Sequence, residues 1–589
     1  MLNLKIAKIF YQMAELYTMK DDQFRPRAYE KAARLIESME DDLEDIYKKG
    51  GLKGLMAIEG VGKGMAEHIE EYVKTGKIKN FEKLKHDAPI DLDSFSSVEG
   101  VGPKMLLALY KNLGVKNIRD LEKAARAGKV RSLPRFGQKS EENILRSIAL
   151  SREHRGRFLL GFVSPIVLKM ERELASAPGV QNVLACGSFR RRRETIGDID
   201  ILAVARPHRD AKQGGQAKNS RAIMEYFCSM PNVEKIIARG DTKSMVRLDI
   251  GIDADLRVVP EKSFGAALQY FTGSKDHNIE LRKIAIRQGW KLNEYGLFDK
   301  NDKYLAGKTE EEIYKKLGLD WMAPEMRENR GEIELALAHK LPKIVEYAEV
   351  LGDLQMHTTY SDGAHTVEEM AEVAQKLGRK YIAITDHVGH LKIAGAMDVA
   401  TIERQWREIE KLNKKIKKIK ILKGCEVDIN PDGTIALPDK YLAKFDVVLG
   451  SIHSNFKMSR ADMTKRLIRA MENPHVDIIS HPTGRVIHKR SGYELDLEEI
   501  FRAAARTKTI LEINSYPDRL DLNDLNIRRA IEHGVKLSLG TDSHSKNQLH
   551  NLDLGIAQAR RGWATKKDVV NCMNAEELLK FLHIPKARL

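Results

Sequence analysis

Cysteine is scarce in this sequence. The 589 residues include four cysteines, which lie far apart and form no CxxC pair. This spacing excludes a disulfide scaffold and a thiolate zinc finger, and it is typical of a protein in a reducing cytosol. No apolar run approaches the roughly 18–20 residues that a membrane-spanning helix needs. Charged residues also interrupt the apolar runs at the N-terminus, which therefore predicts an amphipathic helix and no signal peptide.

Apolar residues, in contrast, make up 42% of the chain. That share excludes disorder over most of the length, because disordered chains contain too few apolar residues to form a core. At about 150 residues per domain, the length predicts roughly four domains or subdomains.

Charge and histidine are distributed unevenly. Residues 101–250 carry a net charge of +14, which is nearly all of the total of +15, whereas residues 1–100 carry −3. Eleven of the 18 histidines lie between residues 351 and 550. Localised basic charge favours a polyanionic partner, and clustered imidazoles favour a metal site.

The apolar pattern changes along the chain. Residues 1–150 show helical spacing with short glycine-marked turns, and residues 180–260 contain the alternating runs of strands. Residues 262–318 predict helices with a hairpin, and residues 319–350 a polar helical connector. From residue 351 onward, short apolar strands alternate with helices of roughly 10–15 residues, which predicts a parallel β/α sheet or barrel.

Two glycine hairpins repeat within the helical region, IEGVGKGMAEHI from residue 58 and VEGVGPKMLLAL from residue 98. Gly60 and Gly62, and likewise Gly100 and Gly102, allow a tight turn whose N–H groups can hold a phosphate oxygen. A Rossmann loop is excluded because no predicted strand precedes either copy. The repeats resemble helix-hairpin-helix motifs, which grip the DNA backbone without reading its sequence. A weaker third copy is LPRFGQKSEENI, from residue 133.

The segment CGSFRRRRETIGDIDILA combines a Gly-Ser turn, a basic run and two acids. Asp198 and Asp200 are two residues apart on a predicted strand, so their carboxylates point to the same face. Two such carboxylates can hold two Mg²⁺ ions about 3.5–4 Å apart. The next acidic strand offers Asp249, Asp253 and Asp255 as the third ligand.

With these motifs, residues 1–318 resemble a family X DNA polymerase, the group of DNA polymerase beta. The resemblance implies that Asp198, Asp200 and Asp255 hold the catalytic metals, since Asp-apolar-Arg-apolar-apolar-Pro begins at Asp255. It also implies that the dNTP contacts Gly187, Ser188, Arg191, Gly197, Tyr270, Phe271, Gly273 and Asn278, and that Arg282 touches the DNA template. The Schiff-base lysine of the family is replaced by His68, which cannot form an imine, so deoxyribose-phosphate lyase activity is not expected. We interpret His68 as a solvated helix residue.

In the second half, six segments place metal-type ligands just after a predicted strand, where β/α barrels build their active sites. Imidazoles and carboxylates without thiolates suit Mn²⁺, Zn²⁺ or Fe²⁺. Residues 350–575 resemble a PHP (polymerase and histidinol phosphatase) domain, which implies up to three metal ions and hydrolysis of phosphoesters. The ligands implied are His357, Asp362, His387, Glu426, His453, His481, Asp542 and His544.

Two further features of this half generate expectations. The usual first PHP motif is His-x-His, but Gln355 stands at its first position and weakens one metal site. Arg485, four residues after His481, is a candidate phosphate clamp. Seven lysines between residues 411 and 423 are interpreted as a solvated helix face, with a DNA-facing patch as the alternative.

The predicted architecture is multidomain: an all-α helix-hairpin-helix region, an α+β nucleotidyltransferase palm with a thumb, and a C-terminal β/α barrel-like PHP domain. The expected boundaries are 1–85 (lyase-like), 86–150 (fingers), 151–261 (palm), 262–318 (thumb), 319–350 (linker) and 351–575 (PHP). We predict a prokaryotic, cytoplasmic, monomeric DNA polymerase that fills short gaps during base excision repair and trims 3′ ends.

Its expected substrates are gapped or primed DNA and dNTPs, with no membrane partner. The expected cofactors are Mg²⁺ or Mn²⁺ for the polymerase and Mn²⁺ or Zn²⁺ for the PHP domain. One alternative is a PHP nuclease whose polymerase half is catalytically weak and only binds DNA. The other is a non-enzymatic repair scaffold, which two complete ligand sets disfavour.

Overall fold

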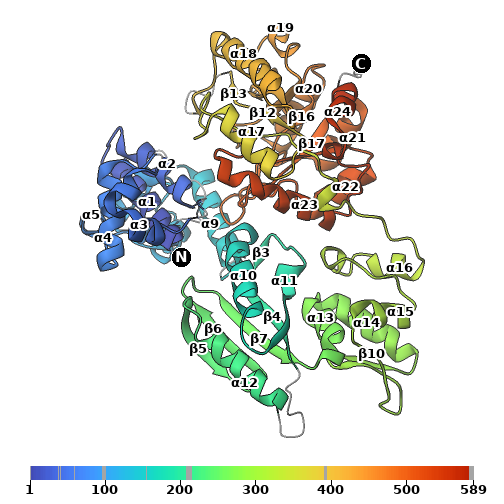
Figure 1. Ribbon diagram of the computed structural model, residues 1–589. Helices are drawn as coiled ribbons and strands as arrows, with labels where there is room; N and C mark the ends of the chain where they lie inside the picture. Colours follow the sequence, from blue (N-terminus) through green and yellow to red (C-terminus); the bar gives the residue numbers. More distant parts are fainter. Residues whose placement is uncertain are drawn as a thin grey trace.

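The computed structural model describes residues 2–37, 39, 41–58, 60–95, 98, 101–134, 136–153, 156–206, 215–389 and 394–582. Figure 1 shows a helical N-terminal region in blue, a mixed palm and thumb in cyan to green, and a barrel in yellow to red. The predicted fold class is confirmed. Within the described residues, no helix is both long and apolar enough to cross a membrane.

The N-terminal region contains nine helices in the described residues, and its apolar faces form one core. The first, α1 (Leu2–Met19), buries Ile6, Phe10 and Met13 at the spacing of one helix face. The others are α2 (Arg25–Glu37), α3 (Leu43–Met56), α4 (Lys63–Thr75), α5 (Lys79–Asp87), α6 (Leu92–Phe95), α7 (Pro103–Leu113), α8 (Ile118–Arg126) and α9 (Gln138–Glu153).

Both glycine hairpins join two helices. Gly62 and Gly102 are the N-caps of α4 and α7, and because glycine has no side chain, neither cap accepts a hydrogen bond from the first amides of its helix. Gly60 has φ +76°, and a Cβ there would lie 2.8 Å from Leu35 Cδ1, so this turn requires glycine. Gly100 lies outside the described residues. The weaker third copy, apart from residue 135, which is not described, spans the turn before α9 and the first turns of that helix.

The palm is a five-stranded sheet in the order β2-β4-β7-β6-β5. Its strands are β2 (Val180–Ala185), β4 (Asp198–Ala205), β5 (Val233–Arg239), β6 (Lys243–Leu248) and β7 (Asp253–Val259), and β4 and β7 form the parallel pair. Helices α10 (Leu160–Ala175) and α12 (Gly215–Cys228) pack on it, and the short α11 (Gly187–Arg190) follows β2. A small ribbon joins β1 (Phe158–Leu159) to β3 (Thr195–Ile196).

The thumb combines three helices with a small antiparallel sheet. Its elements are α13 (Phe264–Thr272), α14 (Lys275–Arg287), β8 (Lys291–Asn293), β9 (Gly296–Phe298), β10 (Tyr304–Ala306) and α15 (Glu310–Lys316). The following segment was expected to be a polar connector, but Met322, Ile333 and Ala336 belong to the thumb core. Residues 319–336, including the first part of α16 (Glu332–Leu337), therefore pack with the thumb.

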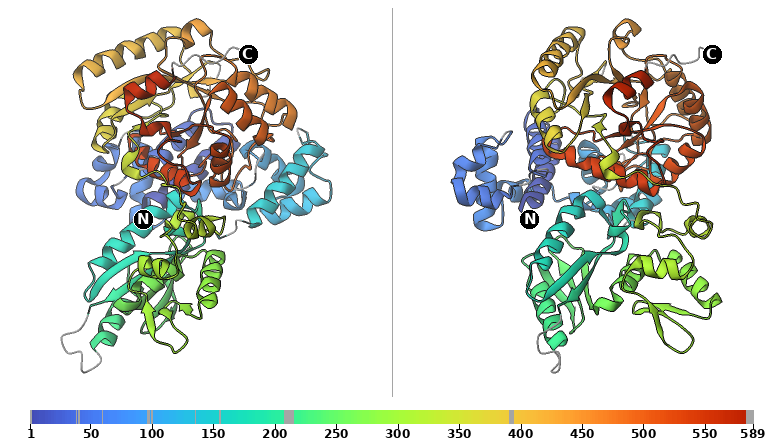
Figure 2. Two further views of the ribbon diagram at one scale, coloured as in Figure 1. Left: turned by 90° about the vertical axis from the view of Figure 1, so that its right-hand side faces the viewer. Right: turned by 45° about the vertical axis from the view of Figure 1, so that its right-hand side comes forward.

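The C-terminal half is a barrel of parallel strands surrounded by helices (Figure 2, right). Its strands are β11 (Gly352–Asp353), β12 (Tyr381–Ile384), β13 (His387–Val388), β14 (Lys420–Asp428), β15 (Val447–Ser451), β16 (Ile478–Ile479), β17 (Ile510–Asn514) and β18 (Leu537–Gly540). Apart from β13, which pairs with β14, they follow each other in chain order. The amide of Leu354 donates to the carbonyl of Leu539 (3.1 Å) and the amide of Asp542 to that of Gln355 (3.0 Å), so the first and last strands meet.

The helices of the barrel lie outside the strands. They are α17 (Val367–Lys376), α18 (Val399–Lys415), α19 (Asp439–Leu442), α20 (Arg460–Met471), α21 (Leu497–Thr507), α22 (Asp524–Glu532), α23 (Leu552–Arg561) and α24 (Ala575–Leu582). Leu520 and Leu554 of the barrel extend the palm core, and a Cβ at Gly161 of α10 would lie 2.8 Å from Pro517. The barrel is therefore packed on the palm through apolar contacts.

One buried carboxylate joins the palm to the thumb. Glu310 of α15 receives two hydrogen bonds from Arg190 of α11 (both 2.8 Å) and two from Arg327 (2.6 and 3.1 Å). Burial by itself raises the pKa of Glu310, but the two guanidinium groups outweigh it and hold the pKa below its ordinary value. Each arginine forms two of these hydrogen bonds because its planar guanidinium presents two N–H groups side by side to the two carboxylate oxygens.

We expect Glu310→Gln to destabilise the protein by about 3 kcal/mol, because Arg327 would remain fully buried without its charged partner. Urea unfolding at pH 7 measures this change. The ionised Glu310 stabilises the folded state in full above the ordinary carboxyl pKa, and this contribution is lost as the pH falls toward the lower pKa of the folded state. The difference in free energy of unfolding between wild type and the variant therefore shrinks as the pH falls below about 4. The exposed neighbour Glu311 supplies the control Glu311→Gln. Equal stability of the two variants would contradict the prediction.

Candidate active sites

Three carboxylates meet at one end of the central palm strands. Asp198 and Asp200 begin β4, and the parallel register sets Asp255 of β7 directly beside Asp200. The other two acids of this region have partners elsewhere. Asp253 is paired with Arg247, and Asp249 lies 3.1 Å from Lys5 of α1. Asp255 is therefore the third carboxylate of the cluster that contains Asp198 and Asp200.

The carboxylate cluster is electrostatically strained in the absence of cations. Burial and the neighbouring charges of Asp198 and Asp255 raise the pKa of Asp200 to about 7. One oxygen of Asp255 is buried without a hydrogen-bond partner, while the other lies 3.2 Å from Lys243. Three oxygen-rich groups with an unsatisfied atom fit a site for hard divalent cations.

A cleft of about 530 Å³ opens beside these carboxylates. Gly187 lines the cleft and has φ +61°, and a Cβ there would lie 2.3 Å from Asp200. The hydroxyl of Ser188 is buried without a partner. The predicted residues that line the cleft are Gly187, Ser188, Arg191, Asp198, Asp200, Tyr270, Phe271, Gly273, Asn278 and Arg282.

Two predicted residues lie just outside this lining. Asp255 borders a smaller recess with Asp200 and Phe271, and a Cβ at Gly197 would lie 3.1 Å from Arg157. Arg157 itself lines the cleft, as do Arg193 and Lys275. Arg193 belongs to the basic run that follows the Gly-Ser turn, whereas the sequence analysis missed Arg157 and Lys275, because the local sequence does not show where a long basic side chain points.

Several of the cleft side chains are held by neighbours. Arg191 donates from Nε to Glu328 (3.1 Å) and from a terminal nitrogen to the Thr272 carbonyl. Asn278 donates to the Tyr270 carbonyl (2.7 Å), and the Arg282 guanidinium lies 5.9 Å from the centre of the Tyr270 ring. The cleft is therefore preorganised by hydrogen bonds on the thumb side.

The second site lies at the carboxyl ends of the barrel strands. His387 begins β13 beside Glu426 of β14, and these two are register partners. His453, His481 and Asp542 follow β15, β16 and β18. The remaining predicted ligands come from the loop after β11 (His357 and Asp362) and from His544.

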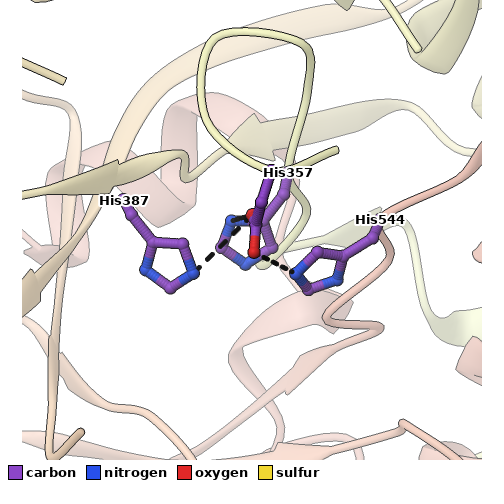
Figure 3. A group of neighbouring side chains, drawn as sticks. His357, His387 and His544 are labelled. Carbon is purple, nitrogen blue, oxygen red and sulfur yellow. Dashed lines mark ion pairs between the residues drawn. The ribbon is translucent and has the colours of Figure 1, made fainter. Parts of the chain in front are cut away.

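All eight predicted barrel residues are brought together. Ligand atoms of His357, Asp362, His387 and His544 lie within 4.8 Å of one another. The same holds for two overlapping groups, one of His387, Glu426 and His453 and the other of His357, Glu426 and Asp542. His481 joins them through Nε2, which lies 3.1 Å from Glu426. Figure 3 shows the imidazoles of His357, His387 and His544 arranged around one carboxylate.

The chemistry of this cluster fits several cations. His357 and His481 each have a buried Nδ1 without a hydrogen-bond partner. Burial lowers the pKa of His387 to about 4, so its imidazole is neutral and able to bind metal. Burial also acts on His453, but hydrogen bonds to Asp428 and Glu426 outweigh it and raise its pKa to about 9. Without cations, some imidazoles therefore carry the protons that balance the carboxylates.

Gln355 stands at the first position of the His-x-His motif, two residues before His357. Its amide oxygen accepts a hydrogen bond from Asn514 (3.2 Å), and its amide nitrogen is buried without a partner. Asn514 also donates to Asp542 (3.1 Å). The sequence analysis missed Asn514, although it ends a strand in the same way as the predicted ligands.

The candidate phosphate clamp is placed elsewhere. Arg485 donates to Glu194 of the palm (2.7 Å) and to the Leu520 carbonyl. The arginine beside the ligands is instead Arg519, whose Nε lies 3.3 Å from Asp542. The lysine run spans the end of α18 and the start of β14, at the amino ends of the strands and so away from the ligands.

His68 differs from the expectation of a solvated residue. It is half-buried on α4, lies 3.3 Å from the amide of Asn80 and stacks on Tyr29. Burial lowers its pKa, which keeps the ring neutral. Lys63 is exposed at the start of the helix and lies 3.9 Å from Glu67.

The raised pKa of Asp200 predicts a stability that depends on pH. In the folded state Asp200 holds its proton up to about pH 7, whereas an unfolded aspartate loses it near pH 4. The metal-free protein therefore loses stability as the pH rises from about 4 to 7. We expect Asp200→Asn to be about 1–2 kcal/mol more stable than wild type at pH 8 and equal to it below pH 4.

Chemical unfolding in a chelator at both pH values tests this prediction. Asp241→Asn on the palm surface, where the carboxylate is exposed and paired with Arg221, is the control. A stabilisation by Asp200→Asn that does not change with pH would contradict the electrostatic explanation.

Comparison with known proteins identifies four regions. Residues 1–78 match a helix-hairpin-helix domain, residues 92–149 a SAM-like helix-hairpin-helix tandem, residues 267–328 a DNA polymerase beta thumb and residues 353–516 a PHP domain. The chain is 37% identical over 566 residues to the DNA polymerase/3′-5′ exonuclease PolX of Bacillus subtilis, covering 95% of this chain and 96% of that protein.

Other relatives match one half of the chain. DNA polymerase lambda of Arabidopsis thaliana is 27% identical over 349 residues, covering 55% of this chain and 62% of that protein. A probable phosphatase of Thermoanaerobacter sp. (strain X514) is 31% identical over 230 residues, covering 37% of this chain and 89% of that protein.

Proposed function

Because the chain belongs to the PolX family of family X DNA polymerases with a C-terminal PHP domain, we propose that it is a DNA polymerase that fills short gaps and also a 3′–5′ exonuclease. The polymerase assignment rests on the strand register that sets Asp255 beside Asp200. The observation that carries the nuclease half is the cluster of imidazoles and carboxylates at the barrel mouth.

In the polymerase site, we assign the metal ligands to Asp198, Asp200 and Asp255. Mg²⁺ or Mn²⁺ bound there would stabilise the charge that develops on the attacking hydroxyl and the departing pyrophosphate. The 3′-oxygen of the primer attacks the α-phosphorus of the dNTP, and the bond to the bridging oxygen of the β-phosphate breaks. The carboxylate of Asp255, beside Asp200, can accept the proton of the attacking hydroxyl.

The other cleft residues bind the nucleotide and the DNA. The Ser188 hydroxyl and the guanidinium groups of Arg157 and Arg191 offer donors for the triphosphate, beside the glycines Gly187 and Gly197. Tyr270, Phe271 and Gly273 contact the sugar, Asn278 the base and Arg282 the template. Gly60, Gly62, Gly100 and Gly102 grip the DNA backbone through the amides of the glycine hairpins.

In the barrel site, we assign the metal ligands to the eight predicted residues, with Gln355 in place of a further imidazole. Mn²⁺ or Zn²⁺, up to three ions, would activate water and stabilise the phosphate undergoing cleavage. Arg519 beside Asp542 offers a fixed positive charge for that phosphate. The expected product is a nucleoside monophosphate released from a 3′ end.

The finer predictions remain part of this proposal: the six domain boundaries, a role in base excision repair, a monomeric state and a cytosolic location. The alternative, a nuclease with a catalytically weak polymerase half, is disfavoured because the strand register sets Asp255 beside Asp200 and leaves one Asp255 oxygen without a hydrogen-bond partner. Variants of the two sites separate these hypotheses.

Asp198→Ala and Asp200→Ala are expected to reduce primer extension at least 1,000-fold, because each removes a ligand from the charge-stabilising cluster. Extension of a gapped duplex with Mg²⁺ measures this loss, and nuclease activity on the same preparation should persist. Asp249→Ala, an acid of the same region that pairs with Lys5, is the matched control. Extension that survives both substitutions would overturn the polymerase assignment.

His357→Ala is expected to abolish nuclease activity and to spare extension, because His357 bridges two of the ligand groups. Release of nucleotides from a 3′-labelled single strand measures the nuclease. His475→Ala, at a turn before β16 and away from the carboxyl ends of the strands, is the control. Loss of extension together with nuclease activity would mean that the two sites are not independent.

A further inference from the structure

Six charged side chains meet where the barrel packs on the palm and thumb. Four are guanidinium groups and two are carboxylates: Arg191, Arg193, Arg330, Arg561, Glu328 and Asp524. Arg561 ends α23, which lies between the barrel strands and α11 in Figure 1. The group therefore joins the barrel to the turn that precedes the palm carboxylates.

Arg561 connects this group through both of its terminal nitrogens. Nη1 donates to the backbone carbonyl of Arg191 (2.7 Å) and to Glu328 (3.0 Å), and Nη2 donates to Asp524 of α22 (2.6 Å). The side chain of Arg561 is only 3% exposed. A guanidinium with several fixed acceptors on different elements is held in one orientation.

Glu328 connects the same group to the cleft. It accepts from Arg191 (3.1 Å), from Arg193 (3.3 Å) and from Arg561, and its side chain is 8% exposed. Arg191 and Arg193 both line the cleft. The barrel helix also contributes Gln558, which donates to the carbonyl of Arg192 in the same turn (3.3 Å).

The balance of charge in this group favours an anion. Four positive and two negative side chains lie together, which leaves an excess of positive charge next to the cleft. Arg193 and Arg330 are partly exposed (39% and 31%), whereas the other four side chains are largely buried. A triphosphate that binds Arg191 supplies negative charge and competes with Glu328 for that guanidinium. Glu328 would then be a buried carboxylate with fewer partners, which is costly unless other cations retain it.

We propose that Arg561 of the barrel is a positioning residue of the polymerase nucleotide site. It holds the Arg191 carbonyl, so the turn of residues 190–193 keeps the shape that aims Arg191 at the triphosphate. Arg561 also remains paired with Glu328 when the triphosphate replaces Glu328 as the partner of the Arg191 guanidinium. The barrel thus contributes to nucleotide binding without touching the nucleotide, an inference that rests on the proposed polymerase function.

The adjacent residue provides a matched control. Arg560 is also on α23, and its side chain is 9% exposed. It connects the barrel to Glu325 (2.8 Å), in the segment that packs with the thumb, and to Glu346 (3.1 Å). Neither of its partners lines the cleft. Arg560→Lys and Arg561→Lys therefore disturb the same interface to a similar extent, but only the second loosens the turn.

The test is steady-state primer extension by the full chain on a gapped duplex with varied dNTP. Arg561→Lys is expected to raise the KM for dNTP about fivefold and Arg561→Gln about tenfold, with kcat and DNA affinity within twofold of wild type. Arg560→Lys is expected to leave the KM within twofold. Nuclease activity on single-stranded DNA should be unchanged in Arg561→Lys, because the barrel ligands are not touched.

Three outcomes decide the inference. Equal changes of KM in Arg560→Lys and Arg561→Lys, or an unchanged KM in Arg561→Lys when wild type extends normally, would overturn it. A parallel fall of kcat, nuclease activity and Tm in Arg561→Lys would assign Arg561 a structural role instead and would also overturn it. If Arg561→Gln does not fold, Arg561→Lys decides alone. Absence of extension by wild type would overturn the proposed function itself, which distinguishes the two failures.

Discussion

Parallel strand pairing is the constraint on which both candidate active sites depend. In the palm, the pairing of β4 with β7 places Asp255 beside Asp200, although 55 positions separate them in the sequence. In the barrel, the pairing of β13 with β14 places His387 beside Glu426. Parallel strands carry their polar end residues to the same edge, so acids and imidazoles from distant segments converge there.

Bringing like charges together costs free energy, and the two sites differ in how far opposite charges offset that cost. The palm cluster contains only carboxylates, and their repulsion together with burial raises the pKa of Asp200 to about 7. The barrel cluster mixes carboxylates with imidazoles, so Asp362 is stabilised in its charged form by His544, His357 and His387 against the effect of burial. The palm site therefore depends more strongly on cations for its charge balance.

The contact between the halves is partly polar and partly apolar. Leu520 and Leu554 complete the palm core, while Arg485 and Arg561 reach Glu194 and Glu328. Apolar packing holds the domains together, and the ion pairs fix their orientation, because a guanidinium requires a particular geometry from its acceptors. The turn that carries Arg191 lies at this contact, so the nucleotide site and the barrel share a boundary.

The sequence alone determined the fold class, the two glycine hairpins and the residues that converge at each site. These features depend on local spacing: period two for Asp198 and Asp200, helical period in the N-terminal region, and strand ends followed by His or Asp in the barrel. It did not reveal that Arg157 reaches the cleft, that residues 319–336 complete the thumb core, or that Arg485 binds Glu194 and leaves Arg519 beside the ligands. Only the tertiary structure decided these, because a long arginine side chain has the same local pattern wherever it points, and its partner is chosen by which domains pack together.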